Sequence, residues 1–203
     1  MPYLTIIAGP NGAGKSTYSE MLLLEHGIKS FDYDKELDIQ WRRFSFDPSV
    51  ERGVRESVEK LFTESKQNAL HSYSNFSFET NYHTEEVVNT MKIFSHNGFL
   101  TELIFIALES SELAIERVKD RVAKGGHYVD EETIRERFNL GLHLLDSSYS
   151  EFDTVSIYLS ETNDLKEILF IEPKKGILKR FQKLPSQLKN KLPNLAFQIA
   201  KEN

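Results

Sequence analysis

The chain has 203 residues, of which 39% are hydrophobic and 28% charged, with a net charge of −6 and no cysteine. This composition is typical of one globular domain and excludes a disordered chain, a disulfide scaffold and a thiolate metal site. No apolar run reaches the roughly 18–20 residues of a membrane span, and the N-terminus lacks the features of a signal peptide, so we expect a cytoplasmic protein.

Apolar runs alternate with helical patterns along the chain. Short apolar runs typical of buried strands lie at residues 4–8, 29–34, 76–78, 100–108 and 155–159. Patterns with helical spacing lie at residues 16–26, 50–73, 84–96, 111–124 and 130–145. This alternation predicts an α/β fold with about five parallel strands and helices on both faces of the sheet.

The charge is uneven along the sequence. Residues 173–203 carry eight Lys or Arg and one Glu, a net charge of +7, which leaves −13 for residues 1–172. We therefore expect a domain at residues 1–172 and a basic, helical C-terminal tail at 173–203. The tail is either a solvated end that lies on the acidic domain or a contact for RNA, an anionic surface or an acidic partner. The acidic body argues against general nucleic-acid binding.

The segment after the first predicted strand matches the phosphate-binding motif G-x-x-x-x-G-K-[ST] and reads Gly9-Pro10-Asn11-Gly12-Ala13-Gly14-Lys15-Ser16. Its glycines let successive backbone N–H groups point at phosphate oxygens, and the following helix adds its N-terminal dipole. Lys15 brings positive charge to the β- and γ-phosphates, Ser16 supplies a hard oxygen ligand for Mg²⁺, and Thr17 is placed to bond the α-phosphate. The loop predicts ATP and Mg²⁺ as ligands.

Other features narrow the class of P-loop protein. The sequence lacks the Leu-Ser-Gly-Gly segment of ABC transporter ATPases, the guanine-reading Asn/Thr-Lys-x-Asp segment of GTPases, and a clear apolar strand ending in Asp at the usual distance. The classes of P-loop protein that hydrolyse nucleotide are therefore thinly supported, which favours phosphoryl transfer. The alternatives are a partner-dependent ATPase switch, a regulatory nucleotide-binding module without turnover, and a kinase that acts on RNA ends.

Acidic residues follow two predicted strands, at the sheet edge where ligands bind in doubly wound folds. Asp32 and Asp34 end the second strand, and Glu79 and Thr80 end the third. Asp34 is our candidate base for a substrate hydroxyl, while Glu79 and Thr80 would orient the substrate or hold a water on Mg²⁺. Alternatively, either aspartate caps a helix that starts near residue 35, and Glu79 caps the next helix.

Arginines flank a Lys-Gly-Gly-His segment at residues 124–127, at positions Arg117, Arg121, Arg135 and Arg137. A helix–glycine–helix segment of this kind, at about residues 117–137, is typical of a lid that stabilises charge during phosphoryl transfer. Surface pairing with the neighbouring acidic residues is the alternative for each arginine. His127 is interpreted as a loop residue or phosphate contact, because no second metal ligand shares its motif.

These segments resemble the zeta-toxin-like P-loop kinases and their small bacterial relatives often labelled ABC-type ATPases. The resemblance covers about residues 3–145 and rests on residues 8–17, Phe78-Glu79-Thr80, and residues 117–129 with their Gly-Gly-His. It implies a P-loop kinase fold with a five-stranded parallel core. It also implies ATP-dependent phosphorylation of a hydroxyl on a UDP-amino sugar, and inhibition by an antitoxin protein.

The resemblance assigns roles to residues that match the family motifs. Asp34 matches the base, Glu79 and Thr80 match the pair at the end of the third strand, and Arg121 and Arg135 match the lid arginines. Asn81 and Tyr82 depart from the small and basic residues common after that pair. In the candidate site, nucleotide is bound by residues 9–17 and Arg117, and Mg²⁺ is bound by Ser16. The substrate is bound by Asp34, Glu79, Thr80 and His127. The catalytic residues are Lys15, Asp34, Arg121 and Arg135.

Overall fold

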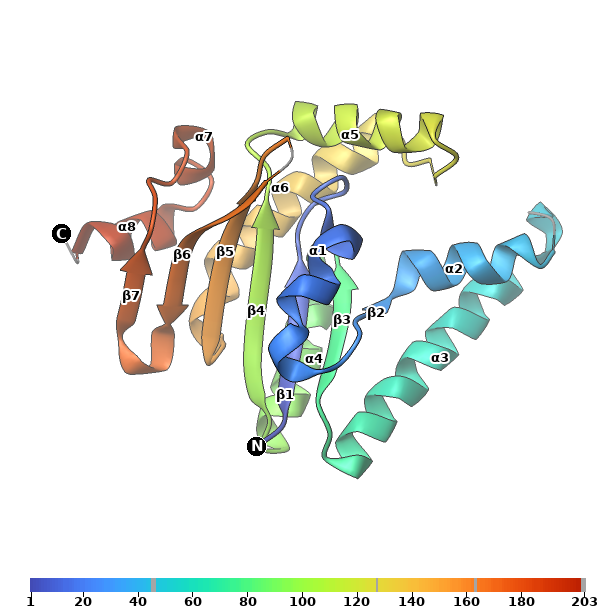
Figure 1. The fold of residues 1–203 in the computed structure, drawn as a ribbon, viewed down its shortest axis with the longest axis horizontal. Coiled ribbons are helices and arrows are strands. Elements are labelled where there is room, and N and C mark those ends of the chain that lie inside the picture. Colours follow the sequence, from blue (N-terminus) through green and yellow to red (C-terminus); the bar gives the residue numbers. More distant parts are fainter. Residues whose placement is uncertain (45–46, 127, 163, 202–203) are drawn as a thin grey trace.

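The computed structural model describes residues 1–44, 47–126, 128–162 and 164–201. These residues form a seven-stranded sheet with the order β2-β3-β1-β4-β5-β6-β7 (Figure 1). The strands are β1 (Tyr3–Ala8), β2 (Phe31–Asp32), β3 (Phe76–Thr80), β4 (Leu100–Ala107), β5 (Thr154–Ser160), β6 (Leu165–Glu172) and β7 (Ile177–Arg180). Strands β1 to β5 pair in parallel, whereas β6 and β7 are antiparallel to their neighbours.

Eight α-helices lie within the described ranges: α1 (Lys15–Leu22), α2 (Tyr33–Arg42), α3 (Glu51–Ser72), α4 (Glu85–His96), α5 (Ser111–Ala123), α6 (Glu131–Ser148), α7 (Ser186–Lys189) and α8 (Pro193–Lys201). Figure 1 shows α1 in front of the sheet, α4 and α6 behind it, and α2 and α3 as a hairpin beyond β2. None of these helices is long and apolar enough to cross a membrane.

The main hydrophobic core joins the central strands to the helices behind them. Strands β1 and β4 read as nearly continuous apolar runs and are buried along most of their length, as expected for parallel strands covered on both faces. Helix α4 contributes one apolar face to this core, formed by Val87, Val88, Met91 and Phe94. The α2–α3 hairpin has its own small cluster of Leu37, Val54 and Val58.

The strand order places a crevice at the carboxyl end of β1. Strand β1 lies between β3 and β4. After β1 the chain forms β2 and β3 on one side of β1, and it then crosses to form β4 on the other side. Ligands bind at such switch points because the loops on the two sides diverge there. The phosphate loop and the ends of β2 and β3 meet at this crevice.

The five parallel strands confirm the predicted α/β architecture, but the second strand is much shorter than residues 29–34. The Asp32 carboxylate accepts a hydrogen bond from the backbone N–H of Lys35 at 3.0 Å, and the chain turns into α2 directly after Asp32. The capping alternative alone predicts α2, although Tyr33, Leu37 and Trp41 recur every four residues and pack in the cluster of the α2–α3 hairpin. Asp34 therefore lies in a helix, not at a strand end.

The prediction of a helical tail at residues 173–203 is wrong for its first part. Strand β7 pairs with β6 at the edge of the sheet, and α7 and α8 follow it. Leu188, Leu192 and Leu195 are buried in the main core. Asp146 on α6 accepts the backbone N–H groups of Asn194 and Leu195 at 3.1 and 3.0 Å, which holds the start of α8 against the domain.

Candidate active site

The phosphate loop connects β1 to α1 at the crevice. Gly9, Gly12 and Gly14 have φ angles of +146°, +79° and +88°, a region that residues with side chains rarely adopt. A Cβ atom on Gly12 would also lie 3.0 Å from the carbonyl oxygen of Ala114 on α5. The glycines therefore permit both the tight curl of the loop and its close approach to α5. Other loop residues are buried, namely Pro10, Asn11 and Ala13.

Lys15 begins α1, and its side chain folds back over the loop. Its Nζ donates to the carbonyl oxygens of Gly9 at 2.8 Å and Pro10 at 3.1 Å, and to Asn81 Oδ1 at 3.0 Å. Desolvation lowers the pKa of Lys15 to about 8, although nearby carboxylates act in the opposite direction. The ammonium group is thus held in a poorly solvated position that suits an anionic ligand.

The hydroxyl of Ser16 lies between carboxylates from β2 and β3. Its Oγ is 2.6 Å from Asp32 Oδ2 and 2.7 Å from Glu79 Oε2. One hydroxyl carries one proton, so it donates to only one of these acceptors at a time. Burial and the charge of Asp32 raise the pKa of Glu79. The two carboxylates therefore repel each other across a hydroxyl oxygen.

This arrangement fits a divalent cation. Mg²⁺ prefers hard oxygen ligands and is usually held by one or two carboxylates together with phosphate and water. A hydroxyl and two carboxylates supply such donors here, and a cation would remove the repulsion between Asp32 and Glu79. Within the described residues there is no group of three or more His, Cys, Asp or Glu residues that could hold a metal ion. The hydroxyl of Ser16 is the third oxygen donor beside Asp32 and Glu79.

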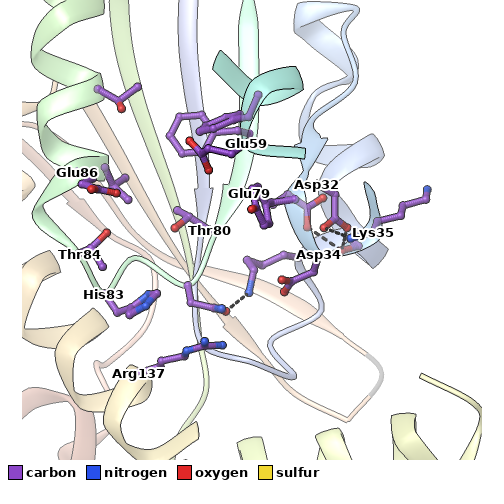
Figure 2. Close-up of a pocket in the computed structure, with 18 of the residues that line it drawn as sticks. Asp32, Asp34, Lys35, Glu59, Glu79, Thr80, His83, Thr84, Glu86 and Arg137 are labelled. Carbon is purple, nitrogen blue, oxygen red and sulfur yellow. Dashed lines mark hydrogen bonds between the residues drawn. The ribbon is translucent and has the colours of Figure 1, made fainter. Parts of the chain in front are cut away.

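Asp34 lies in the first turn of α2, and its exposed side chain lines a cavity of about 690 Å³. Lys15 and Ser16 line the same cavity. Figure 2 shows Asp34 and Glu79 on one side of this cavity, His83 on the other side, and Thr80 between them. We call this space the acceptor cavity.

The structure shows which of these acidic residues cap a helix. Asp32 is the N-cap of α2, as the capping alternative predicts for one of the two aspartates, whereas Asp34 lies in the first turn of that helix. The N-cap of α4 is Thr84, and the Glu79 side chain is bound to Ser16 instead. Thr80 lines the acceptor cavity and also accepts the backbone N–H of Tyr82 on Oγ1 at 3.0 Å. Asp34 and Glu79 are therefore both available to a ligand in this cavity.

Three arginines line the acceptor cavity: Arg55 from α3, Arg121 from α5 and Arg137 from α6. Arg135 instead forms an ion pair with Glu112 on α5. Residues 135 and 137 point in very different directions because successive helical positions differ by about 100°. The structure thus brings Arg121 to the phosphate loop and keeps Arg135 in a surface pair. His127 lies outside the described residues.

Arg117 binds the phosphate loop and the end of β5. Its guanidinium donates to Gly12 O at 3.4 Å, to Ser160 Oγ at 2.7 Å and to Glu161 O at 2.7 Å. Arg117 and Thr17 line a second cavity of about 690 Å³, which Arg121 also borders. We call this space the nucleoside cavity. Arg121 therefore lies where the two cavities approach each other.

The residues that line the acceptor cavity but are absent from the sequence-based site include Asn81, His83 and Arg137. His83 Nδ1 is buried with no hydrogen-bond partner among the described residues, and burial together with Arg137 lowers the pKa of His83. Arg137 could have been chosen over Arg135 from the apolar face of α6, because it is adjacent on the helix surface to buried Ile134 and Gly141. Asn81 follows Glu79 and Thr80 directly in the sequence, and it differs from the small and basic residues common at that position in the family.

The model of the Zeta toxin family matches residues 1–170. The chain belongs to the zeta toxin family. It is 25% identical over 133 residues to an uncharacterized protein of Haemophilus influenzae, a match that covers 64% of this chain and 88% of that protein.

Solved structures support the fold of this zeta toxin family member. A structure of the PezAT chromosomal toxin-antitoxin system of Streptococcus pneumoniae has a TM-score of 0.63 and 16% identity, covering 99% of this chain and 87% of that chain. The AvrRxo1-ORF1:ORF2 complex with ATP has a TM-score of 0.64 and 12% identity, covering 95% of this chain and 63% of that chain. At these identities the similarity establishes the P-loop kinase fold.

Proposed function

We propose that this protein is a cytoplasmic, ATP- and Mg²⁺-dependent kinase that transfers the γ-phosphoryl group of ATP to a hydroxyl group of a small molecule. The observation that carries the proposal is that Lys15, Ser16, Asp34 and Glu79 all line one cavity of about 690 Å³. A cationic group, a cation-binding hydroxyl and a proton acceptor within one space are what phosphoryl transfer requires. The membership of the zeta toxin family agrees with this proposal.

ATP would lie across both cavities. Its nucleoside would occupy the nucleoside cavity near Thr17 and Arg117, and its phosphates would follow the N–H groups of the phosphate loop. The γ-phosphate would then reach Lys15 at the entrance of the acceptor cavity. Mg²⁺ bound to Ser16, with Asp32 and Glu79 beside it, would neutralise phosphate charge.

The acceptor hydroxyl would be activated by Asp34. Its carboxylate takes the hydroxyl proton as the oxygen bonds to the γ-phosphorus, and the bond from that phosphorus to the bridging oxygen of ADP breaks. Lys15 and Arg121 stabilise the negative charge on the transferred group. Glu79 and Thr80 line the β3 side of the acceptor cavity, where they would contact the acceptor. The products are ADP and a phosphate ester.

The test is incubation of the protein with ATP labelled at the γ-phosphate, Mg²⁺ and a bacterial metabolite extract, followed by identification of the labelled product. A UDP-amino sugar is the first pure acceptor to add, because the family resemblance implies it. A labelled phosphate ester supports the kinase. Free phosphate alone supports the ATPase switch, and nucleotide binding without ADP formation supports the regulatory module.

A protein partner is part of this proposal. The PezAT structure comes from a chromosomal toxin-antitoxin system, and the AvrRxo1 structures hold ORF1 and ORF2 together. We propose that this chain is likewise restrained by an antitoxin. Co-expression with the product of a neighbouring gene, followed by co-purification and assay of transfer, tests this directly.

Nucleotide affinity is expected to fall as the pH rises above about 8. The pKa of Lys15 in the free protein is about 8, and only its charged form attracts phosphate. Bound phosphate favours the ammonium form of Lys15, so ATP affinity should be independent of pH well below 8. Near pH 8 to 9, binding of ATP should be accompanied by uptake of a proton. As the pH rises further, the affinity should fall by up to about tenfold per pH unit. Titration calorimetry with ATP and Mg²⁺ at pH 6.5 to 9.5 in two buffers measures both quantities. Constant affinity without proton uptake would contradict the assignment.

The arginines provide a matched comparison on neighbouring helices. Arg121→Ala and Arg137→Ala are each expected to lower the transfer rate by about 10²–10³-fold with a smaller loss of ATP affinity, because charge that develops during transfer would lose a partner. Arg135→Ala should stay within about threefold of wild type, because it removes only a surface ion pair. Steady-state rates and ATP titrations separate the variants. A larger loss in Arg135→Ala than in Arg137→Ala would restore the family assignment over the geometric one.

A further inference from the structure

Asn81 connects the phosphate loop to the acceptor cavity. It follows β3, lines the acceptor cavity and accepts a hydrogen bond from Lys15 Nζ on Oδ1 at 3.0 Å. The Lys15 ammonium can only donate, so the amide must turn its oxygen toward Lys15. Its NH₂ group then points away from Lys15 and forms no hydrogen bond among the described residues.

The backbone around Asn81 is held in an unusual conformation. Tyr82 has a φ angle of +56°, which a bulky residue rarely adopts, and its side chain is fully buried. Its hydroxyl is 2.8 Å from Ser148 Oγ on α6. Because Ser148 Oγ also donates to the carbonyl oxygen of Leu144, Tyr82 is the donor in its bond to Ser148. Such strained turns persist only where the surrounding structure fixes them.

Helix α6 also approaches the backbone of Asn81 itself. A Cβ atom on Gly141 would lie 3.0 Å from the carbonyl oxygen of Asn81 and 3.5 Å from that of Tyr82. Glycine at this position therefore allows α6 to pack directly on the turn. Arg137 lies one helical turn earlier on α6 and lines the same cavity as Asn81. The turn after β3 is thus tied to the helix that carries an arginine of the site.

We propose that Asn81 positions Lys15 for transfer and that its free NH₂ group contacts the transferred phosphoryl group. This inference rests on the proposed kinase function. The Asn81 oxygen holds the Lys15 ammonium at the boundary between the phosphate loop and the acceptor cavity. The NH₂ group adds a neutral donor on the acceptor side of the same phosphoryl group, and the turn at Tyr82, fixed by α6, sets its direction.

The test compares Asn81→Ala with wild type and with Asn89→Ala, a matched change at an exposed asparagine on α4. Transfer is measured with labelled ATP, Mg²⁺ and the metabolite extract, and ATP binding is measured by calorimetry. Asn81→Ala should lower kcat by about 10- to 100-fold and change the Kd for ATP by less than about threefold, because the lost contacts act mainly in the transition state. Asn89→Ala should match wild type in both quantities.

Two further variants separate positioning from folding. Asn81→Asp keeps the shape and an oxygen that faces Lys15 but replaces the NH₂ donor with a negatively charged oxygen that repels the transferred phosphoryl group, so kcat should fall at least as far as in Asn81→Ala, while a thermal midpoint no lower than that of wild type shows that the fold is retained. Gly141→Ala leaves Asn81 intact but pushes its carbonyl oxygen away from α6, so kcat should fall by about 3- to 10-fold, in line with the cost of small displacements. A wild-type kcat in Asn81→Ala or Asn81→Asp overturns the inference.

The outcome for wild type separates the two proposals. Transfer by wild type with an unchanged rate in Asn81→Ala overturns the role of Asn81 and leaves the kinase function standing. Absence of any labelled ester with wild type overturns the kinase function and the role of Asn81 with it. Equal losses of kcat and ATP affinity in Asn81→Ala would make Asn81 a ground-state support of the loop and would also overturn the inference.

Discussion

Lys15→Ala is expected to reduce phosphoryl transfer by at least about 10²–10³-fold, because it removes the buried positive charge that faces the phosphates. The same change should leave the fold intact. Lys15 is the first residue of α1, its side chain contributes nothing to the hydrophobic core, and alanine is a good helix former. Transfer assays, ATP titration and thermal unfolding of the purified variant measure the three quantities.

Lys60→Ala is the matched control for this variant. Lys60 lies on α3, is mostly exposed, and is 3.8 Å from Glu64 in a surface pair of small energetic value. Its removal should change neither transfer nor ATP binding. Turnover of Lys15→Ala within about tenfold of wild type would contradict the assignment of residues 9–16 as an ATP-binding loop.

The central fold could be predicted because its strands and helices carry strong patterns. Strands β1 and β4 are buried on both faces, so their sequences are nearly all apolar and the chain between them alternates with amphipathic helices. The edge strand β7 gave no such signal. Strand β7 has four residues and lies at the edge of the sheet, where Lys179 and Arg180 remain exposed. Edge strands with charged residues do not show the apolar pattern of a buried strand.

Part of the site could likewise be predicted from the local sequence, whereas the rest depends on the tertiary structure. The phosphate loop is contiguous in sequence, so its motif identifies it without knowledge of the fold. The meeting of Ser16 with Asp32 and Glu79 depends on the order β2-β3-β1, which places three distant segments side by side. The choice of Arg137 over Arg135 could have been made from the sequence, because the apolar face of α6 shows which arginine is adjacent to Ile134 and Gly141. Asn81 reaches Lys15 only because the turn at Tyr82 has a positive φ angle, which no motif encodes.

Asp34→Asn is expected to lower transfer to the true acceptor by about 10²–10⁴-fold while ATP affinity changes little, because positioned acid–base groups contribute that much. Asparagine has the size of aspartate, and the Asp34 side chain is exposed in the first turn of α2, so packing should not suffer. The change removes the proton acceptor and one negative charge near Lys15. Comparison of kcat for the acceptor with the Kd for ATP separates loss of the base from loss of binding.

Glu64→Gln supplies the control, because Glu64 is exposed on α3, lies outside the lining of the acceptor cavity and is 3.8 Å from Lys60 in a surface pair. It removes one negative charge, as Asp34→Asn does, and should remain within about threefold of wild type, the loss typical of a surface pair. Asp32→Asn is unsuitable as a mild control, because the Asp32 carboxylate is bound to Ser16 and caps α2. If Asp32→Asn abolishes transfer and Asp34→Asn does not, Asp34 is not the base, and the position of the base that the family resemblance implies is wrong. If transfer survives both changes, no carboxylate at this end of β2 takes the proton, and the ATPase-switch alternative then explains the geometry of the phosphate loop better than a kinase does.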